Sequence, residues 1–129
     1  LDRVGYIEAR DANARVIISS STAINNSFVI IADKTSVRIG RDCLIGTNFF
    51  VSDSDFHGIS ISERRGGKQE CQDVIIEDNV FIGNSVSVMK GVKIGQGSVI
   101  GAGSLVVSDV ESMSVYGGVP AKKLRDLDN

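Results

Sequence analysis

The chain has 129 residues, enough for one hydrophobic core, and 42% of them are hydrophobic. No apolar segment reaches the length of about 20 residues that a membrane-spanning helix needs. Basic and acidic residues nearly balance, 14 against 16, so the composition lacks the basic excess of a nucleic-acid-binding surface. We therefore expect one domain over residues 1–129, with no membrane span and no nucleic-acid partner.

The cysteines bear on the cellular compartment. Cys43 and Cys71 match neither a disulfide framework nor a metal-binding motif. No secretory signal is visible in the sequence. We therefore expect a reducing, cytoplasmic setting.

The N-terminal half carries a hydrophobic spacing of six residues. Apolar clusters between residues 16 and 31 fit this spacing loosely, and residues 1–15 have no clear phase. From residue 37 the spacing is regular, and glycine follows two of the leading aliphatic residues, as a tight turn requires. The pattern predicts short strands joined by corners, with Cys43 in the core. The leading residues are Ile39, Ile45 and Val51, preceded two places earlier by Val37, Cys43 and Phe49.

Residues 52–73 interrupt the spacing with the segment SDSDFHGISISERRGGKQECQD, which contains the only histidine, His57. Irregular segments of this length in compact domains are usually functional or mobile. We therefore expect an irregular loop here that carries chemistry. Its basic residues Arg64, Arg65 and Lys68 fit a solvated loop tip.

From Val74 to Val110 the spacing of six continues without a gap. It matches neither the period of a helix nor the alternation of a plain strand, so one side chain in six must meet the same feature of a repeating backbone. Residues two apart on a strand share a face, which turns each pair inward and predicts a β-solenoid. The leading series is Ile76, Ile82, Val88, Ile94, Ile100 and Val106, and the second is Val74, Val80, Val86, Val92, Ser98, Ser104 and Val110.

Residues 111–129 form a tail beyond the array. GGVP at 117–120 is a turn signal. AKKLRDL at 121–127 has the composition of about two helical turns, so we expect a short C-terminal helix.

Three parts of the sequence resemble the hexapeptide-repeat acyltransferases. They are the I-G-x-x-x-x tandem, GVKIGQGSVIGAGSLVVSDV at 91–110 and GGVPAKKL at 117–124. The resemblance is strongest to the branch of maltose, galactoside and polysaccharide O-acetyltransferases. It implies an all-β fold, a left-handed parallel β-helix with an irregular loop and a short C-terminal helix. It also implies a homotrimer with active sites between neighbouring copies.

The same resemblance implies acetyl-CoA-dependent acetyl transfer to a hydroxyl of a carbohydrate or another small acceptor. A loop histidine at the position of His57 would act as general base, because a hydroxyl attacks a thioester poorly until its proton is removed. Asp53 or Asp55 would support the imidazolium, and either could also bind sugar hydroxyls. Asn48 matches a family asparagine near the acceptor, although asparagine also suits a corner.

The resemblance also implies where coenzyme A binds, and no metal is expected. The carried-over contacts are Phe81, where the family usually has Trp, together with Asn84, Ala102, Lys122 and Arg125. The last two would meet the nucleotide phosphates through charge-assisted contacts. Residues 107–109 depart from the usual V-T-K-D pattern, so a threonine and a lysine of the family are missing here.

Two alternatives use the same repeat: an N-acetyltransferase of an amino sugar and a non-catalytic scaffold subunit. His57 and the GGVPAKK segment favour an enzyme, because a scaffold needs neither. A zinc hydratase site built of several histidines does not fit a chain with one histidine.

Overall fold

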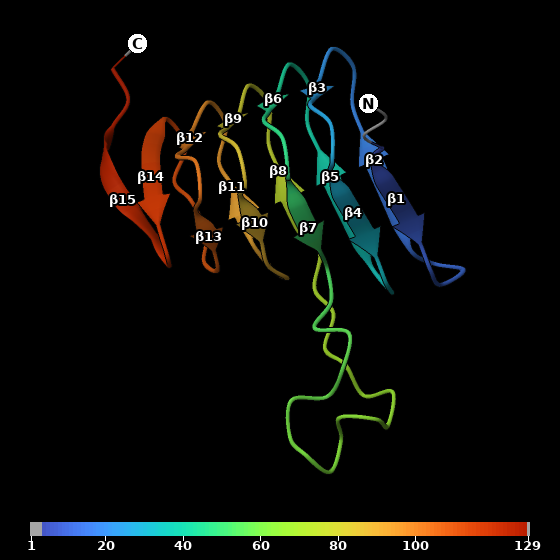
Figure 1. Cartoon of the computed structure of the whole chain (residues 1–129). Coiled ribbons are helices and arrows are strands. Elements are labelled where there is room, and N and C mark those ends of the chain that lie inside the picture. Colours follow the sequence, from blue (N-terminus) through green and yellow to red (C-terminus); the bar gives the residue numbers. More distant parts are fainter. Residues whose placement is uncertain (1–3, 129) are drawn as a thin grey trace.

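Residues 4–128, which the computed structural model describes, form three β-sheets and contain no helix (Figure 1). This part of the chain accordingly offers no helix able to cross a membrane. Sheet A contains β1 (Tyr6–Ala9), β4 (Val29–Ala32), β7 (Phe50–Ser52), β10 (Ser87–Val88) and β13 (Leu105–Val106). Sheet B contains β2 (Arg15–Ile18), β5 (Ser36–Ile39), β8 (Val74–Ile76) and β11 (Lys93–Ile94). Sheet C contains β3 (Ala23–Ile24), β6 (Leu44–Ile45), β9 (Phe81–Ile82), β12 (Val99–Ile100), β14 (Ser114–Gly118) and β15 (Ala121–Asp126).

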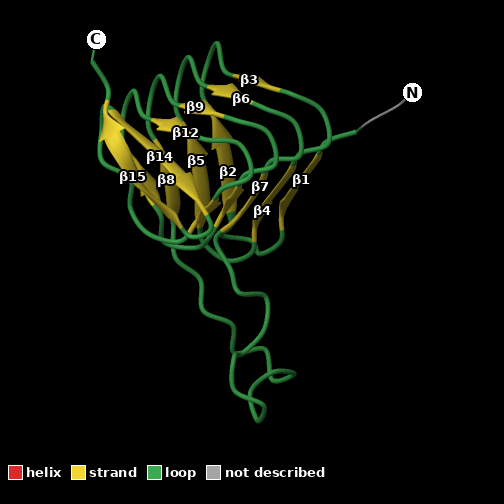
Figure 2. Cartoon of the chain, turned by 60° about the vertical axis from the view of Figure 1, so that its left-hand side comes forward, coloured by secondary structure: helices red, strands yellow, loops and turns green. Residues whose placement is uncertain are grey.

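The sheets are the faces of a prism, seen obliquely in Figure 2. Through β12, each coil places one strand in sheet A, one in sheet B and one in sheet C, and each strand pairs in parallel with the equivalent strand of the next coil. This is the left-handed parallel β-helix that the sequence predicted.

The core is the stack of inward side chains predicted from the spacing of six. Ile82, Val86, Val88, Ile94 and Ile100 have no exposed surface. Even the two serines of the inward series are buried, because each hydroxyl donates a 2.6 Å hydrogen bond to a nearby carbonyl oxygen. Such bonds remove the cost of burying a hydroxyl among aliphatic side chains.

Only one corner of the prism varies in length between coils. The links from sheet B to sheet C, and from sheet C to sheet A, keep one length through β13. The corner between sheets A and B is regular only in the coil of β10 and β11. Counted between paired positions of the two sheets, Val88 to Ile94 is a step of six residues, whereas Ile7 to Ile18, Ile30 to Ile39 and Val51 to Ile76 are steps of 11, 9 and 25. The extra residues of the three earlier coils lie at 10–14, at 33–35 and within 53–73. The loop around His57 is thus the longest of three insertions stacked at one corner.

The expected C-terminal helix is wrong, because residues 121–126 form strand β15. The chain reverses after Gly118, whose positive φ of 106° suits glycine, and β15 pairs antiparallel with β14. This pairing satisfies the backbone groups along the end of sheet C, which a helix would leave open. Tertiary pairing therefore overrides the helical propensity of AKKLRDL.

Candidate active site

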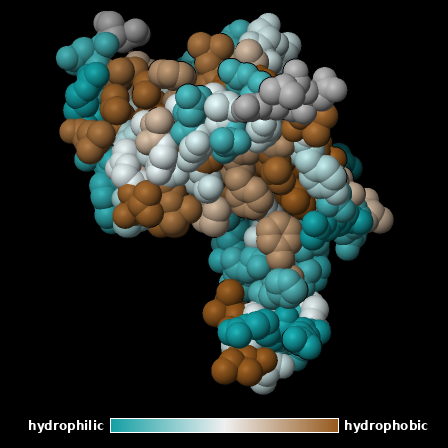
Figure 3. Space-filling view, in the orientation of Figure 1, coloured by the Kyte–Doolittle hydropathy of each residue, from teal (hydrophilic) through white to brown (hydrophobic). Residues whose placement is uncertain are grey.

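The loop at residues 53–73 projects from the corner between sheets A and B (Figure 1). Its stem is a short antiparallel ladder, with a bridge between Ser54 and Cys71. The Asp55 amide donates to the Glu70 carbonyl at 3.1 Å, and the Gln72 amide donates to the Asp53 carbonyl at 2.8 Å. The protruding loop is mainly hydrophilic in Figure 3, and its exposed large apolar residues are Ile59 and Ile61.

Asp53 anchors this stem from inside the prism. Its carboxylate has no exposed surface and accepts hydrogen bonds from the amides of Asp33, Lys34 and Thr35, at 2.6, 3.1 and 2.7 Å. The Thr35 hydroxyl donates a fourth bond of 2.8 Å. In this structure the Asp53 carboxylate therefore faces neither solvent nor His57, and it ties the third insertion to the second.

Asp33 makes a further link between the two insertions. Its carboxylate accepts from the Ser54 hydroxyl at 2.8 Å and from the Gln69 side-chain amide at 2.9 Å. Burial raises the pKa of Asp33, but these two hydrogen bonds, together with the charges of Arg10 and Lys34, leave the pKa below its ordinary value. Both strands of the loop stem are thus fixed to one buried carboxylate.

Phe56 turns the backbone immediately before His57. Its φ is 65°, in the left-handed region that a bulky side chain rarely adopts. Two contacts hold it there: its amide donates to the Ser54 hydroxyl at 2.8 Å, and the Arg10 guanidinium lies 5.1 Å from the ring centroid. Strain of this kind persists only where surrounding contacts impose it, and here it sets the direction of the next side chain.

His57 is exposed, and one of its ring nitrogens is already bonded. Nδ1 lies 3.0 Å from the carbonyl oxygen of Arg64. A carbonyl can only accept, so in the neutral ring Nδ1 carries the proton and donates it. Nε2 is left with its lone pair, which is the arrangement that a general base requires.

A cavity of about 210 Å³ lies beside His57 between the loop and the prism. Its charged lining residues are Asp55, Glu63, Lys68, Glu70 and Lys90. Lys90 reaches the cavity from the corner after β10, and its Nζ lies 3.3 Å from Asp55 and 3.9 Å from Glu70. Sequence reasoning missed Lys90, because both its partners are in an irregular segment.

Asn48, Asn84 and Ala102 lie at a different corner, between sheets C and A. All three are exposed, and Asn48 adopts a φ of 59° that suits a turn. The Asn84 side chain accepts a hydrogen bond of 2.9 Å from the Thr47 amide of the preceding coil. The structure thus stacks these predicted residues along one edge of the prism and places His57 at another.

Phe81 points outward from sheet C and is 51% exposed. It lines a mostly apolar hollow of about 430 Å³ with Leu44, Ala23 and neighbouring residues of β3 and β6. Lys122 and Arg125 are exposed on β15, the last strand of the same sheet. Lys123 is engaged with Glu111 and Asp126, both at 2.7 Å. The predicted coenzyme A contacts therefore lie on sheet C and along its edge.

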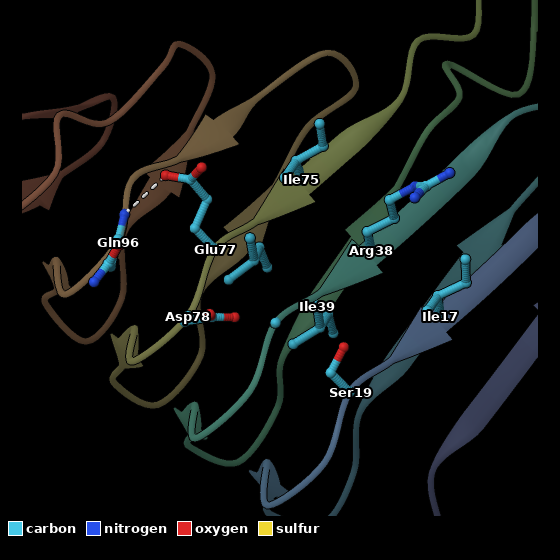
Figure 4. Close-up of a pocket in the computed structure, with 10 residues that line it drawn as sticks. Ile17, Ser19, Arg38, Ile39, Ile75, Glu77, Asp78 and Gln96 are labelled. Atoms are coloured by element: carbon cyan, nitrogen blue, oxygen red, sulfur yellow. Dashed lines mark hydrogen bonds between the residues drawn. The ribbon is translucent and has the colours of Figure 1, made fainter.

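A further hollow lies on the outer face of sheet B, where Arg38 stands between Ile17 and Ile75 (Figure 4). Its Glu77 carboxylate accepts from the Gln96 amide at 3.0 Å and pairs with Lys93 at 3.6 Å. This hollow has no histidine among its lining residues. It offers no candidate base comparable with His57.

Comparisons with known proteins agree with this architecture. A family model for the bacterial transferase hexapeptide (six repeats) matches residues 73–108, and one for the hexapeptide repeat of succinyl-transferase matches residues 36–62. A polysialic acid O-acetyltransferase of Escherichia coli O1:K1 / APEC is 41% identical over 112 residues. The match covers 87% of this chain and 36% of that protein, so this chain spans about a third of its curated relative.

Two solved structures show the same fold. The polysialic-acid-specific acetyltransferase NeuO is 41% identical, with a TM-score of 0.85, over 95% of this chain and 56% of that one. A hexapeptide-repeat acetyltransferase from Vibrio cholerae O1 biovar eltor, crystallised with acetyl coenzyme A, is 30% identical with a TM-score of 0.83. This match covers 98% of this chain and 71% of the other. With the repeats matched and the coils superposed, the chain belongs to the hexapeptide-repeat acetyltransferases.

Proposed function

We propose that this protein transfers an acetyl group from acetyl-CoA to a hydroxyl of a carbohydrate, with His57 as the general base. The observation that carries the proposal is the hydrogen bond from His57 Nδ1–H to the Arg64 carbonyl, which leaves Nε2 able to accept a proton. The name of the Escherichia coli relative, a polysialic acid O-acetyltransferase, supports a saccharide acceptor.

In the proposed reaction, His57 Nε2 takes the hydroxyl proton as the acceptor oxygen forms its bond to the thioester carbonyl carbon. The imidazolium then returns this proton to the thiolate of coenzyme A as the carbon–sulfur bond breaks. Transfer is direct, because His57 activates the acceptor hydroxyl itself and no covalent acyl-enzyme is required. Backbone N–H groups would stabilise the negative charge on the carbonyl oxygen of the tetrahedral intermediate.

The proposed active site forms between two copies of the chain. His57 lies at the corner between sheets A and B, whereas Asn48, Asn84 and Ala102 follow the corner between sheets C and A. A ring of three copies would set the corner between sheets A and B of one copy against the corner between sheets C and A of its neighbour. Such an interface joins two different surface patches. Asn48 would then contact the acceptor, and Asp55, which lines the cavity beside His57, would support the base.

The proposed path of coenzyme A follows sheet C. Phe81 and the hollow beside it would contact the pantetheine, Asn84 and Ala102 would lie along the same edge, and the exposed Lys122 and Arg125 would meet the phosphates. The Vibrio cholerae relative crystallised with acetyl coenzyme A supports this donor. Both cysteines are free thiols, which fits the proposed cytoplasmic location.

The test is release of coenzyme A thiol from acetyl-CoA across a panel of saccharides. Wild type should turn over with at least one acceptor, and His57→Ala should lower kcat by about 10²- to 10⁴-fold. Ile61→Ala, on the exposed part of the same loop, is the matched control and should match wild type. Full activity of His57→Ala would remove the proposed base. Turnover with amino sugars alone would favour N-acetylation, and no turnover together with no coenzyme A binding would favour a scaffold.

A further inference from the structure

Lys90 joins the regular array, the coils from Val74 to Val110, to the loop that carries His57. It follows β10, in the coil where the corner between sheets A and B has no insertion. Its Nζ lies 3.3 Å from the carboxylate of Asp55 and 3.9 Å from that of Glu70. These two residues belong to opposite strands of the loop stem, whose backbones meet in the 3.1 Å bond from the Asp55 amide. One ammonium therefore clamps both strands.

The contact with Asp55 is more buried than an ordinary surface ion pair, whereas Glu70 is 81% exposed and makes the weaker, outer contact of the clamp. The side chains of Lys90 and Asp55 are 24% and 26% exposed, so solvent screens their interaction less than that of a fully exposed pair. Lys90 and Asp55 also line the cavity beside His57. A substitution of Lys90 would therefore change both the position of the loop and the charge around the imidazole.

We propose that Lys90 is a positioning residue for His57, a role that rests on the proposed acetyl transfer. It holds Asp55, two residues before the histidine, and so fixes the direction in which Nε2 meets an acceptor. Its positive charge also offsets the negative charge of the acidic side chains that line the cavity. The charged groups that line this cavity with His57 are the acidic Asp55, Glu63 and Glu70 and the basic Lys68 and Lys90.

This role predicts a specific kinetic pattern. Lys90→Met keeps most of the length of the side chain but removes the charge, so kcat should fall about tenfold while KM for acetyl-CoA stays unchanged. The remaining carboxylates would favour the protonated imidazole, so the acidic limb of the pH profile of kcat/KM should move to higher pH. Lys90→Arg should restore most of kcat and the wild-type profile.

Lys93→Met is the matched control. Lys93 lies on the next strand, β11, and pairs with Glu77 at 3.6 Å, but Glu77 belongs to the prism and not to the loop. This variant removes the same charge from a more exposed ion pair outside the loop and should keep kcat and the pH profile. An unchanged kcat and profile in Lys90→Met, or equal changes in Lys93→Met, would overturn the positioning role.

Amide hydrogen exchange tests the clamp without relying on activity. In Lys90→Met the amides of Asp55 and Gln72, which are bonded across the stem, should exchange faster, whereas the Phe81 amide inside the prism should not change. Unchanged exchange at the stem would overturn the clamp. If wild type shows no acetyl transfer, the proposed function fails, and the exchange result still decides whether Lys90 holds the loop.

Discussion

The coils after Val74 and the coils before it are built on the same three sheets and differ at one corner. After Val74 the link from sheet A to sheet B is short and regular, and the interior is a stack of aliphatic side chains with two serines bonded locally. Before Val74 the same corner carries three insertions, and the carboxylates of Asp53 and Asp33 join the second to the third. Both regions share one packed core, and directed hydrogen bonds between insertions add to that packing only before Val74.

This difference separates stability from chemistry. Packing of equivalent side chains produces a rigid edge. Because every coil repeats the last, no coil presents a functional side chain that the others lack. The insertions break the repeat and place a strained Phe56, a bonded His57 and the Lys90 clamp at one point. Substitutions in the two regions should therefore differ in kind as well as in size.

The largest expected effect on stability is in the regular array. Ile94→Ala should lower the free energy of unfolding by about 2–5 kcal/mol, because Ile94 is completely buried and its removal leaves a cavity. Ile75→Ala, on the adjacent strand but facing outward and 37% exposed, should cost much less. Urea denaturation measures both, and equal losses would contradict an aliphatic stack as the source of stability.

The next effect is at the base of the loop. Asp53→Asn should cost about 2 kcal/mol, because the amides of residues 33–35 lose a charged acceptor in a buried site. Asp55→Asn, two residues along the same stem, removes a partly exposed ion pair and should cost less than about 1 kcal/mol. Similar urea midpoints for the two variants would contradict the anchoring role of Asp53.

A smaller effect is expected for the proposed phosphate contacts on β15. Lys122→Ala and Arg125→Ala should each raise KM for acetyl-CoA about three- to tenfold with little change in kcat, since exposed charge contacts contribute modestly. Lys123→Ala is a control for general loss of charge, because Lys123 is paired with Glu111 and Asp126. A matching rise in KM for the acceptor would argue against contact with coenzyme A.

The smallest effect is the acid response of the insertion corner. The pKa of Asp73 is lowered, chiefly by the hydrogen bond from the Ser36 hydroxyl, and that of Asp33 is lowered as well. A carboxyl with a lowered folded pKa adds stability above its unfolded value of about 3.9, and this is lost as the pH falls further. The urea midpoint should drop below about pH 4, and less in Asp73→Asn than in wild type. Equal drops would remove Asp73 as a source.

The sequence predicted the fold because the spacing of six is a repeated local signal. Every residue of the inward series from Val74 to Val110 is buried, and Cys43 is in the core as expected. The helix expected at residues 121–127 was wrong, because the composition of this segment carries no information about the open edge of β14, with which residues 121–126 pair instead.

The candidate site was predicted less completely because its contacts join irregular segments. His57 could be chosen as the only histidine in the interruption, but its bond to the Arg64 carbonyl depends on the path of the loop. The position of Asp53 inside the prism depends on the insertion at residues 33–35, and the role of Lys90 depends on two partners in the stem. No spacing in the sequence encodes these pairs.

In the proposed assembly the loop of one copy meets the edge of a neighbour that carries Asn48, and mixing two inactive variants tests this contact. His57→Ala and Asn48→Ala, each impaired alone, should regain activity when unfolded together and refolded as mixed assemblies. With one type of site between neighbours in a trimer, random mixing at equal amounts restores about a quarter of the sites. Recovery near that level of thiol release is the predicted result, and no recovery from mixed assemblies would contradict the account.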